Sequence, residues 1–237
     1  PVTVFAFEGS KMVNKTKVFG LDKTAGWWKC ISLADVDGDG DQDLMAGNIG
    51  LNHRMHASEK YPVTLIASDF DGNGSTDPIM CYYYNGKQYP FAGRDAIISQ
   101  VPMLKKKFTR YTPYASATIN DIFTEDQLEK STWLYTNTFQ TTLFRNEGRS
   151  FVAVPLPYQV QLNPVNDMVI RDFNNDGRMD ILMAGNFLFS EPETGELDAG
   201  IGTLLLQLAD GTFGYVSNTE HGFWAQGEVR EMKQIKL

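Results

Sequence analysis

Cysteine and histidine are scarce in this chain of 237 residues. It has two cysteines, Cys30 and Cys81, and three histidines, His53, His56 and His221. Two thiols can make at most one disulfide, and both lie in apolar, strand-like stretches, so we expect buried free cysteines, with one bridge as the alternative. A zinc pair at His53 and His56 would need a third soft ligand, and the sequence places none nearby. The sequence therefore favours neither a disulfide framework nor a zinc site.

Long apolar runs and the common catalytic motifs are also missing. No segment has the roughly 18 consecutive apolar residues needed to cross a bilayer. No secretory leader is recognisable and the chain begins with Pro1, so we expect a mature or excised part of an exported protein, with any leader or lipid anchor upstream. The absence of Walker, Gly-x-Gly-x-x-Gly and Gly-x-Ser-x-Gly motifs gives nucleotide binding and serine hydrolysis no support. The net charge of −8 argues against a nucleic-acid-binding surface.

What the chain does have is a short acidic loop that occurs three times, at Asp35–Asp43, Asp69–Asp77 and Asp172–Asp180. Side-chain oxygens are expected as ligands at positions 1, 3, 5 and 9 of each loop, and a backbone carbonyl at position 7. The candidate metal ligands in the three loops are Asp35, Asp37, Asp39, Asp41 and Asp43; Asp69, Asp71, Asn73, Ser75 and Asp77; and Asp172, Asn174, Asp176, Arg178 and Asp180.

Carboxylates packed this closely repel one another, and a hard dication removes that repulsion. Calcium accepts six to eight oxygens in irregular geometry, whereas magnesium prefers a strict octahedron. Gly38 and Gly40 allow the sharp turn that aims alternate side chains inward. A solvated acidic turn would explain one loop, but three in register predict up to three Ca²⁺ ions. We expect the third loop to be the weakest, because Asn174 replaces a carboxylate and Arg178 could ligate only through its carbonyl, with its side chain outward.

The flanking sequence excludes an EF-hand. An EF-hand needs a bidentate Glu at position 12 and two helices, but position 12 is Ala46, Met80 or Met183. The stretches beside the first and third loops are short and apolar, and are typical of strands: Lys29–Ala34, Leu44–Ala46, Val169–Ile170 and Ile181–Met183. We therefore expect calcium loops set in β-hairpins.

Such a loop, followed by an apolar strand and Gly-Asn, resembles the FG-GAP/VCBS repeat of integrin-α-like β-propellers. The pentapeptide Leu-Met-Ala-Gly-Asn follows two of the loops, at Leu44–Asn48 and Leu182–Asn186. The wider chain also resembles FG-GAP-repeat proteins of Bacteroidetes-type bacteria, some of which carry an ASPIC/UnbV segment. The resemblance covers most of the chain, and the loops are its specific part. It implies an all-β propeller, or a propeller segment, of four-stranded antiparallel blades.

Internal hairpins support this organisation. The third loop predicts a whole blade, with strands at Asn166–Asp172 and Met179–Ala184 and a hairpin at Gly202–Val216. Two further hairpins are expected in 1–19 and 142–154, and the closely spaced first two loops are expected to share one irregular blade. We expect a single domain over 1–237 with about four blade-like units, at 1–21, 29–61, 62–155 and 164–217.

Both ends of the chain are expected to lie within blades. Val229–Leu237 alternates like an inner strand, so either it pairs with the N-terminal hairpin to close a small ring, or the chain is a slice of a larger propeller. Trp27-Trp28 and Phe223-Trp224 precede inner strands, where packing between blades is expected and a ligand platform is the alternative.

A helical insertion is predicted near 94–133. Helices are expected at Asp95–Gln100, Pro102–Phe108 and Gln127–Lys130, the last after a capping box that begins at Thr124. A basic patch at Lys105–Lys107 and Arg110 is either a solvated face or a docking site for an anion. Aromatic residues flank the insertion and could pack or stack on sugars: Tyr82, Tyr83, Tyr84, Tyr89, Phe91, Tyr111 and Tyr114.

The resemblance implies an extracellular, cell-surface or periplasmic module that binds a protein or carbohydrate ligand, with structural Ca²⁺. We expect no enzyme, because calcium would hold the clustered carboxylates ionised and unsuited to proton transfer. The alternatives are an accessory domain or a catalytic propeller of a carbohydrate- or lipid-active enzyme. A pocket lined by His53, Arg54 and a tyrosine would favour the catalytic one. Fold alone does not choose among them.

Overall fold

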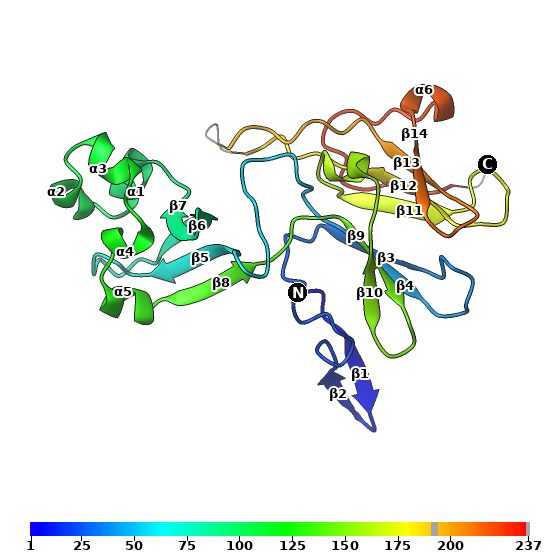
Figure 1. Ribbon diagram of the computed structural model, residues 1–237, viewed down its shortest axis with the longest axis horizontal. Coiled ribbons are helices and arrows are strands. Elements are labelled where there is room, and N and C mark those ends of the chain that lie inside the picture. The colour runs from blue at the N-terminus through cyan, green and yellow to red at the C-terminus, as the bar shows by residue number, and fades with distance from the viewer. Residues whose placement is uncertain (191–193, 236–237) are drawn as a thin grey trace. The chain divides into compact units, whose positions relative to one another are not determined.

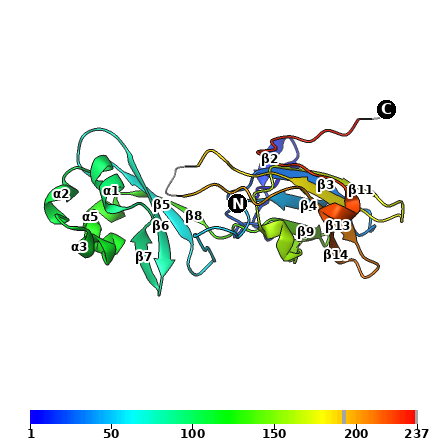
Figure 2. The same cartoon turned by 90° about the horizontal axis from the view of Figure 1, so that it is seen from above.

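The computed structural model of the chain describes residues 1–190 and 194–235 (Figures 1 and 2). Contacts divide the chain into two compact units: Met55–Thr138, and Pro1–Arg54 together with Phe139–Leu237. The chain is mostly β, with four-stranded antiparallel sheets and a small helical insertion, as the sequence predicts. A closed propeller ring is not detected among the described residues.

The first sheet of the larger unit joins two hairpins that are far apart in the sequence. Its order is β10-β9-β4-β3, with β3 at Cys30–Ala34, β4 at Asp43–Gly47, β9 at Thr142–Asn146 and β10 at Phe151–Val154. Because Leu44 of β4 pairs with Phe144 of β9, the whole smaller unit is inserted between the second and third strands. The prediction that the first two loops share one blade is wrong, since the second loop joins strands of the smaller unit.

The second sheet confirms the four strands predicted around the third loop. Its order is β11-β12-β13-β14, with β11 at Asp167–Arg171, β12 at Asp180–Ala184, β13 at Thr203–Gln207 and β14 at Phe213–Val216. A 3₁₀ turn, Tyr158–Gln161, precedes the sheet, and the short helix α6, Asn218–His221, follows it. The sheet is a simple meander of consecutive strands, which explains why local sequence pattern was sufficient to predict it.

The core of the larger unit lies between these two sheets (Figure 1). Buried apolar side chains from both sheets meet there, among them Met45, Leu143, Ile181, Met183 and Leu205. The other face of the first sheet is covered by the N-terminal segment, whose Val2 and Leu21 pack on Leu44, Ala46 and Phe144. The predicted N-terminal hairpin is present as β1, Phe5–Glu8, and β2, Lys11–Asn14. It forms a separate two-stranded sheet.

The C-terminal prediction is wrong. Residues 229–235 contain no strand, and 236–237 of the predicted Val229–Leu237 lie outside the described residues. The segment is attached to the start of β11 by side chains: Asn166 donates to the Val229 carbonyl (2.8 Å), and the Met232 amide donates to Asp167 (2.6 Å). The alternating pattern was misleading because isolated polar contacts, rather than a strand ladder, satisfy this backbone.

The smaller unit has its own sheet, in the order β7-β6-β5-β8. Its strands are β5 at Val63–Ser68, β6 at Asp77–Tyr84, β7 at Lys87–Pro90 and β8 at Thr132–Thr136. Five helices lie beside the sheet (Figure 1): α1 at Arg94–Gln100, α2 at Leu104–Lys107, α3 at Tyr111–Ala115, α4 at Ile119–Ile122 and α5 at Glu125–Glu129. One face of the sheet packs against the helices through a cluster that includes Ile66, Ile79, Ile97, Leu104 and Ile119.

The predicted helical insertion is confirmed, and so is the capping box at Thr124 and Gln127. Two further short helices, α3 and α4, were not predicted. Lys107 donates to the Ile122 carbonyl (3.3 Å), so this part of the basic patch also contacts the fold. Tyr114 is buried, whereas Tyr111 is exposed.

Close backbone packing explains the repeated pentapeptide. A Cβ on Gly47 would lie 2.5 Å from the Val165 carbonyl oxygen, and a Cβ on Gly185 would lie 1.9 Å from the Pro164 carbonyl oxygen. The asparagines that follow, Asn48 and Asn186, are buried. Asn186 also holds Gly200 through two hydrogen bonds of 2.8 Å each. The motif therefore lets a second chain segment cross directly over the end of the strand.

Both cysteines are free, as expected; Cys81 is buried and Cys30 half-buried. Burial raises the pKa of the Cys30 thiol to about 11 and that of Cys81 to about 12. Because the thiolate is the reactive form, we expect neither thiol to react quickly with iodoacetamide at about pH 8 in the folded protein, and both to react in denaturant. Mass spectrometry of the alkylated protein measures this. Rapid double modification of the folded chain would contradict it.

Candidate metal centre

All three acidic loops are closed by the aspartate at position 1. The carboxylate of this residue accepts hydrogen bonds from backbone amides later in its own loop, always including the glycine at position 6. These bonds are Gly40 to Asp35 at 3.0 Å, Gly74 to Asp69 at 2.8 Å, and Gly177 to Asp172 at 2.8 Å. The backbone amides of Gly74 and Gly177, respectively, are the main reason that the pKa values of Asp69 and Asp172 lie below the ordinary aspartate value. Both carboxylates are therefore ionised at neutral pH.

Positions 3 and 5 repeat a second pattern. Each side-chain oxygen accepts from the backbone amide two residues further on, the geometry of an Asx-turn. At position 3 the distances are 3.3 Å for Asp37, 3.2 Å for Asp71 and 3.0 Å for Asn174. At position 5 they are 2.8 Å for Asp39, 2.7 Å for Asn73 and 2.9 Å for Asp176. The repeated spacing in the sequence thus corresponds to a repeated local structure.

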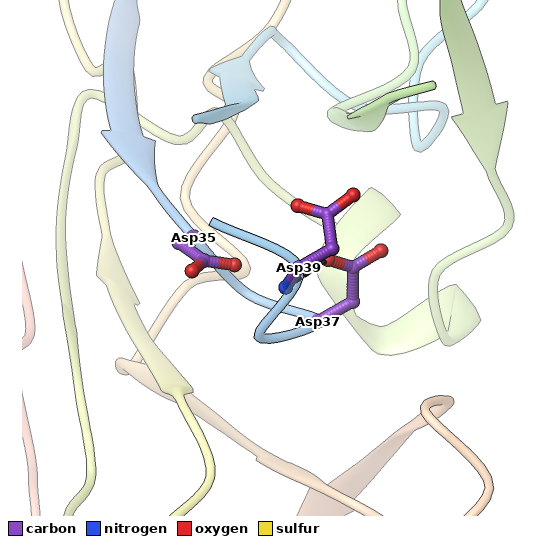
Figure 3. Close-up of side chains that lie close together, drawn as sticks. All are labelled: Asp35, Asp37 and Asp39. Carbon is purple, nitrogen blue, oxygen red and sulfur yellow. Dashed lines mark hydrogen bonds between the residues drawn. The ribbon is translucent and has the colours of Figure 1, made fainter. Parts of the chain in front are cut away.

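Two of the loops gather three carboxylates each. In the first loop the group is Asp35, Asp37 and Asp39, and Figure 3 shows these side chains on one turn. In the second loop it is Asp69, Asp71 and Asp77. The possible ligand oxygens of each group lie within 4.8 Å of one another, so both groups could hold a metal ion such as Ca²⁺. Partial burial, and then the charge of Asp43, raise the pKa of Asp37.

The aspartate at position 9 has an additional role that the sequence did not reveal. Asp43, Asp77 and Asp180 are buried, and each accepts from the backbone amide at position 2 of its loop, at 2.9, 3.1 and 2.8 Å. In the larger unit the second oxygen also reaches the third strand of the sheet. Asp43 accepts from the Asn146 amide at 2.8 Å and Asp180 from the Gln207 amide at 3.0 Å. These residues therefore brace the loops, whether or not they also bind metal.

The third loop differs from the other two at position 7. The Arg178 side chain does not point outward as expected: its guanidinium pairs with Asp176, and its Nε donates to the Gln207 carbonyl (2.9 Å). The Asn174 amide also donates to Asp176 (2.8 Å). Asp172, Asp176 and Asp180 do not form a three-carboxylate group within the described residues. Asp176 is thus already paired with the Arg178 guanidinium of its own loop.

The other two loops also differ in their counter-ions. In the first loop, Arg145 Nε lies 3.3 Å from an Asp37 oxygen, although it makes no hydrogen bond there. No carboxylate of the second loop has an ion pair within the described part of the chain. At position 7, the side chains of Asp41 and Ser75 are exposed. Asp41 is not part of the three-carboxylate group of the first loop. The second loop therefore has no counter-ion among the described residues, but with three aspartates it also carries less negative charge than the first loop, which has five.

The histidine and tryptophan candidates lie in packed surroundings. His53 Nε2 is 3.0 Å from the Gly50 carbonyl, and its ring packs edge-on against Phe139. No histidine joins a metal-binding group among the described residues. Trp27 also packs on Phe139, and the Trp28 indole donates to the Thr24 carbonyl (2.8 Å). These contacts favour packing for both tryptophans.

Comparisons of the chain with protein families, with characterised proteins and with solved structures found no match. The resemblance to FG-GAP/VCBS repeats thus depends on the loops, the pentapeptide and the four-stranded sheets alone. Among the described residues, no helix is long and apolar enough to cross a membrane.

Proposed function

We propose that this chain is a calcium-binding β module of an exported protein, located outside the cell, on its surface or in the periplasm, and that it binds a protein or carbohydrate partner. One observation carries the calcium assignment. The same oxygen-lined loop joins two neighbouring strands in each of the three four-stranded sheets, β3 to β4, β5 to β6 and β11 to β12. Calcium would fix these loops and, through them, the surface at that edge of each sheet.

A structural role for the metal follows from the hydrogen bonds. The carboxylates at positions 1, 3 and 5 are oriented by backbone amides, and calcium would keep them ionised. A general acid or base must instead exchange a proton near neutral pH. We therefore propose that the chain has no catalytic activity of its own.

Nearby cations affect how tightly each loop is expected to bind calcium. A cation already beside a carboxylate weakens its attraction for calcium. We expect the third loop, with Arg178 on Asp176, to bind calcium most weakly. The first loop has five aspartates against three in the second, so it should bind calcium at least as tightly as the second despite Arg145 near Asp37.

Calcium should raise the thermal stability of the chain. At about 1 mM free calcium, a site with a Kd of about 0.1–1 mM adds about 0.4–1.4 kcal/mol. The two carboxylate groups together should therefore contribute about 1–3 kcal/mol. Differential scanning calorimetry with calcium, magnesium, zinc or chelator measures this, and mass spectrometry gives the stoichiometry. Bound zinc in the absence of calcium would overturn the assignment.

Variants separate metal binding from turn formation. Asp39→Ala removes a ligand and one Asx-turn bond, so the variant should lose stability in calcium but lose little, or gain, in chelator because carboxylate repulsion is relieved. Asp210→Ala is the matched control, since Asp210 is an exposed turn aspartate outside the loops that accepts from Thr212 (3.0 Å). Equal destabilisation of the Asp39 variant in both solutions would show that Asp39 is only a turn residue.

The binding role has a separate test. A glycan array and a pull-down for protein partners, each carried out on the full-length protein with and without calcium, should show binding that calcium strengthens. Binding that is identical in calcium and in chelator would separate the partner site from the metal loops.

A further inference from the structure

The smaller unit contains a cavity of about 640 Å³ between α4, α5 and β8. It is lined by Asn120, Phe123, Glu125, Leu128, Glu129 and Trp133. A volume of this size is within the range of clefts that bind small organic ligands. Among the described residues no acidic-loop residue lines the cavity, but the second loop is adjacent to it: the lining residue Phe123 stacks on Phe70 (ring centroids 3.9 Å apart), and Gln127 of α5 donates to the Phe70 carbonyl (3.0 Å).

One wall of the cavity is apolar and already positioned. The Trp133 indole donates to the Leu128 carbonyl (3.0 Å), which fixes the half-buried ring at the edge of the helices. Phe123 is buried beside it. The Tyr135 ring lies nearly parallel to the Trp133 ring, with centroids 6.4 Å apart and planes at 19°, and extends the aromatic surface along β8. A ligand would therefore meet a preformed aromatic wall.

The polar groups that line the cavity are mainly carboxylates without counter-ions. Glu125 and Glu129 lie one turn apart on α5, where like charges repel. Neither makes an ion pair or a hydrogen bond within the described residues, whereas the neighbouring Asp126 pairs with Lys130 (2.7 Å). The Asn120 side-chain amide likewise makes no hydrogen bond with any residue that the structure describes, so it can bind a ligand. The cavity thus combines an aromatic wall with two uncompensated negative charges.

We propose that this cavity binds an organic cation with an apolar body. Its ammonium or guanidinium group lies beside Glu125 and Glu129, and its carbon chain lies along Trp133, whose ring face attracts cations. A neutral sugar could also stack on the indole, but it would leave the repulsion between the two glutamates uncompensated. The charge therefore selects a cation, either a basic side chain of a protein partner or a free polyamine.

Butylammonium tests whether the cavity binds an organic cation. Butanol is the uncharged probe of the same chain length. NMR of the Trp133 indole N–H, assigned by its loss in Trp133→Phe, should shift saturably with butylammonium and not with butanol at equal concentration. The double variant Glu125→Gln, Glu129→Gln should weaken this binding by about fivefold or more. Asp126→Asn removes one charge from the same helix outside the cavity, and should change binding by less than about twofold.

Two further probes distinguish the source of the cation. Tighter binding of an acetylated Gly-Lys-Gly amide than of spermidine would indicate a protein partner, and the reverse order a polyamine. No saturable shift with butylammonium, or equal binding of butanol, would overturn the proposal. So would cellobiose binding that the double glutamine variant leaves unchanged, because that result identifies a saccharide site. These titrations are carried out both in calcium and in chelator. The metal assignment is tested separately, by calcium stoichiometry and by Asp39→Ala in the first loop, so failure of the cation proposal leaves it intact.

Discussion

Asp180→Ala should lower the free energy of unfolding by about 2–5 kcal/mol, the largest effect we expect from a single substitution. The Asp180 side chain is fully buried and accepts from the amides of Phe173 (2.8 Å) and Gln207 (3.0 Å). Its removal leaves two enclosed N–H groups without acceptors, and each costs about 1–3 kcal/mol. Chemical denaturation of both proteins measures the difference.

The calcium dependence of this loss identifies its cause. Because the bonds of Asp180 are internal to the fold, the loss should be similar in calcium and in chelator. Asp210→Ala, at an exposed turn of the same sheet, should cost about 1 kcal/mol or less. A loss confined to calcium-containing solution would contradict the bracing role and make Asp180 mainly a metal ligand.

Gly185→Ala should destabilise the chain by about 3 kcal/mol. The added methyl group would lie 1.9 Å from the Pro164 carbonyl oxygen and 2.8 Å from the Asn166 amide nitrogen, so the backbone of the crossing segment must move. That movement would disturb the bond between the Asn166 amide and the Ala184 carbonyl (3.0 Å). Thermal unfolding of the variant and the parent chain measures the loss.

Substitutions of two other glycines serve as comparisons for Gly185→Ala. Gly47→Ala is the equivalent change after the first loop, with a closest backbone approach of 2.5 Å, and should cost less. Gly93, the residue before α1, has φ of −65° and nothing within 4 Å of an added Cβ. Gly93→Ala should therefore change stability by less than about 0.5 kcal/mol. Equal effects at Gly185 and Gly93 would show that the close approach is absent in solution.

Hydrogen bonds within the chain contribute to the shape of the loops. The carboxylates at positions 1, 3 and 5 already accept backbone hydrogen bonds, and the position 9 aspartate ties two of the loops to a neighbouring strand. Folding without metal is therefore expected, with calcium adding stability and order. This differs from a small zinc domain, in which the metal supplies most of the folding free energy.

Local chemistry determined much of the structure from the sequence alone. The three loops, the strands beside them, the meander around the third loop and the capping box at Thr124 all depend on residues close together in the chain. Glycine, aspartate and asparagine at fixed spacing impose the same turn wherever they occur, because the hydrogen bonds that form it are between near neighbours.

Only the tertiary structure decided which distant segments meet. The pairing of β4 with β9 across an inserted unit depends on long-range burial, for which a local pattern gives no signal. The inward orientation of the Arg178 side chain depends on its hydrogen bond to the Gln207 carbonyl. The cavity at Trp133 depends on how α4 and α5 pack beside β8. The alternation in Val229–Leu237 predicted a strand, but a strand forms only where a partner edge is available. In 229–235, hydrogen bonds with the side chains of Asn166 and Asp167 are found instead.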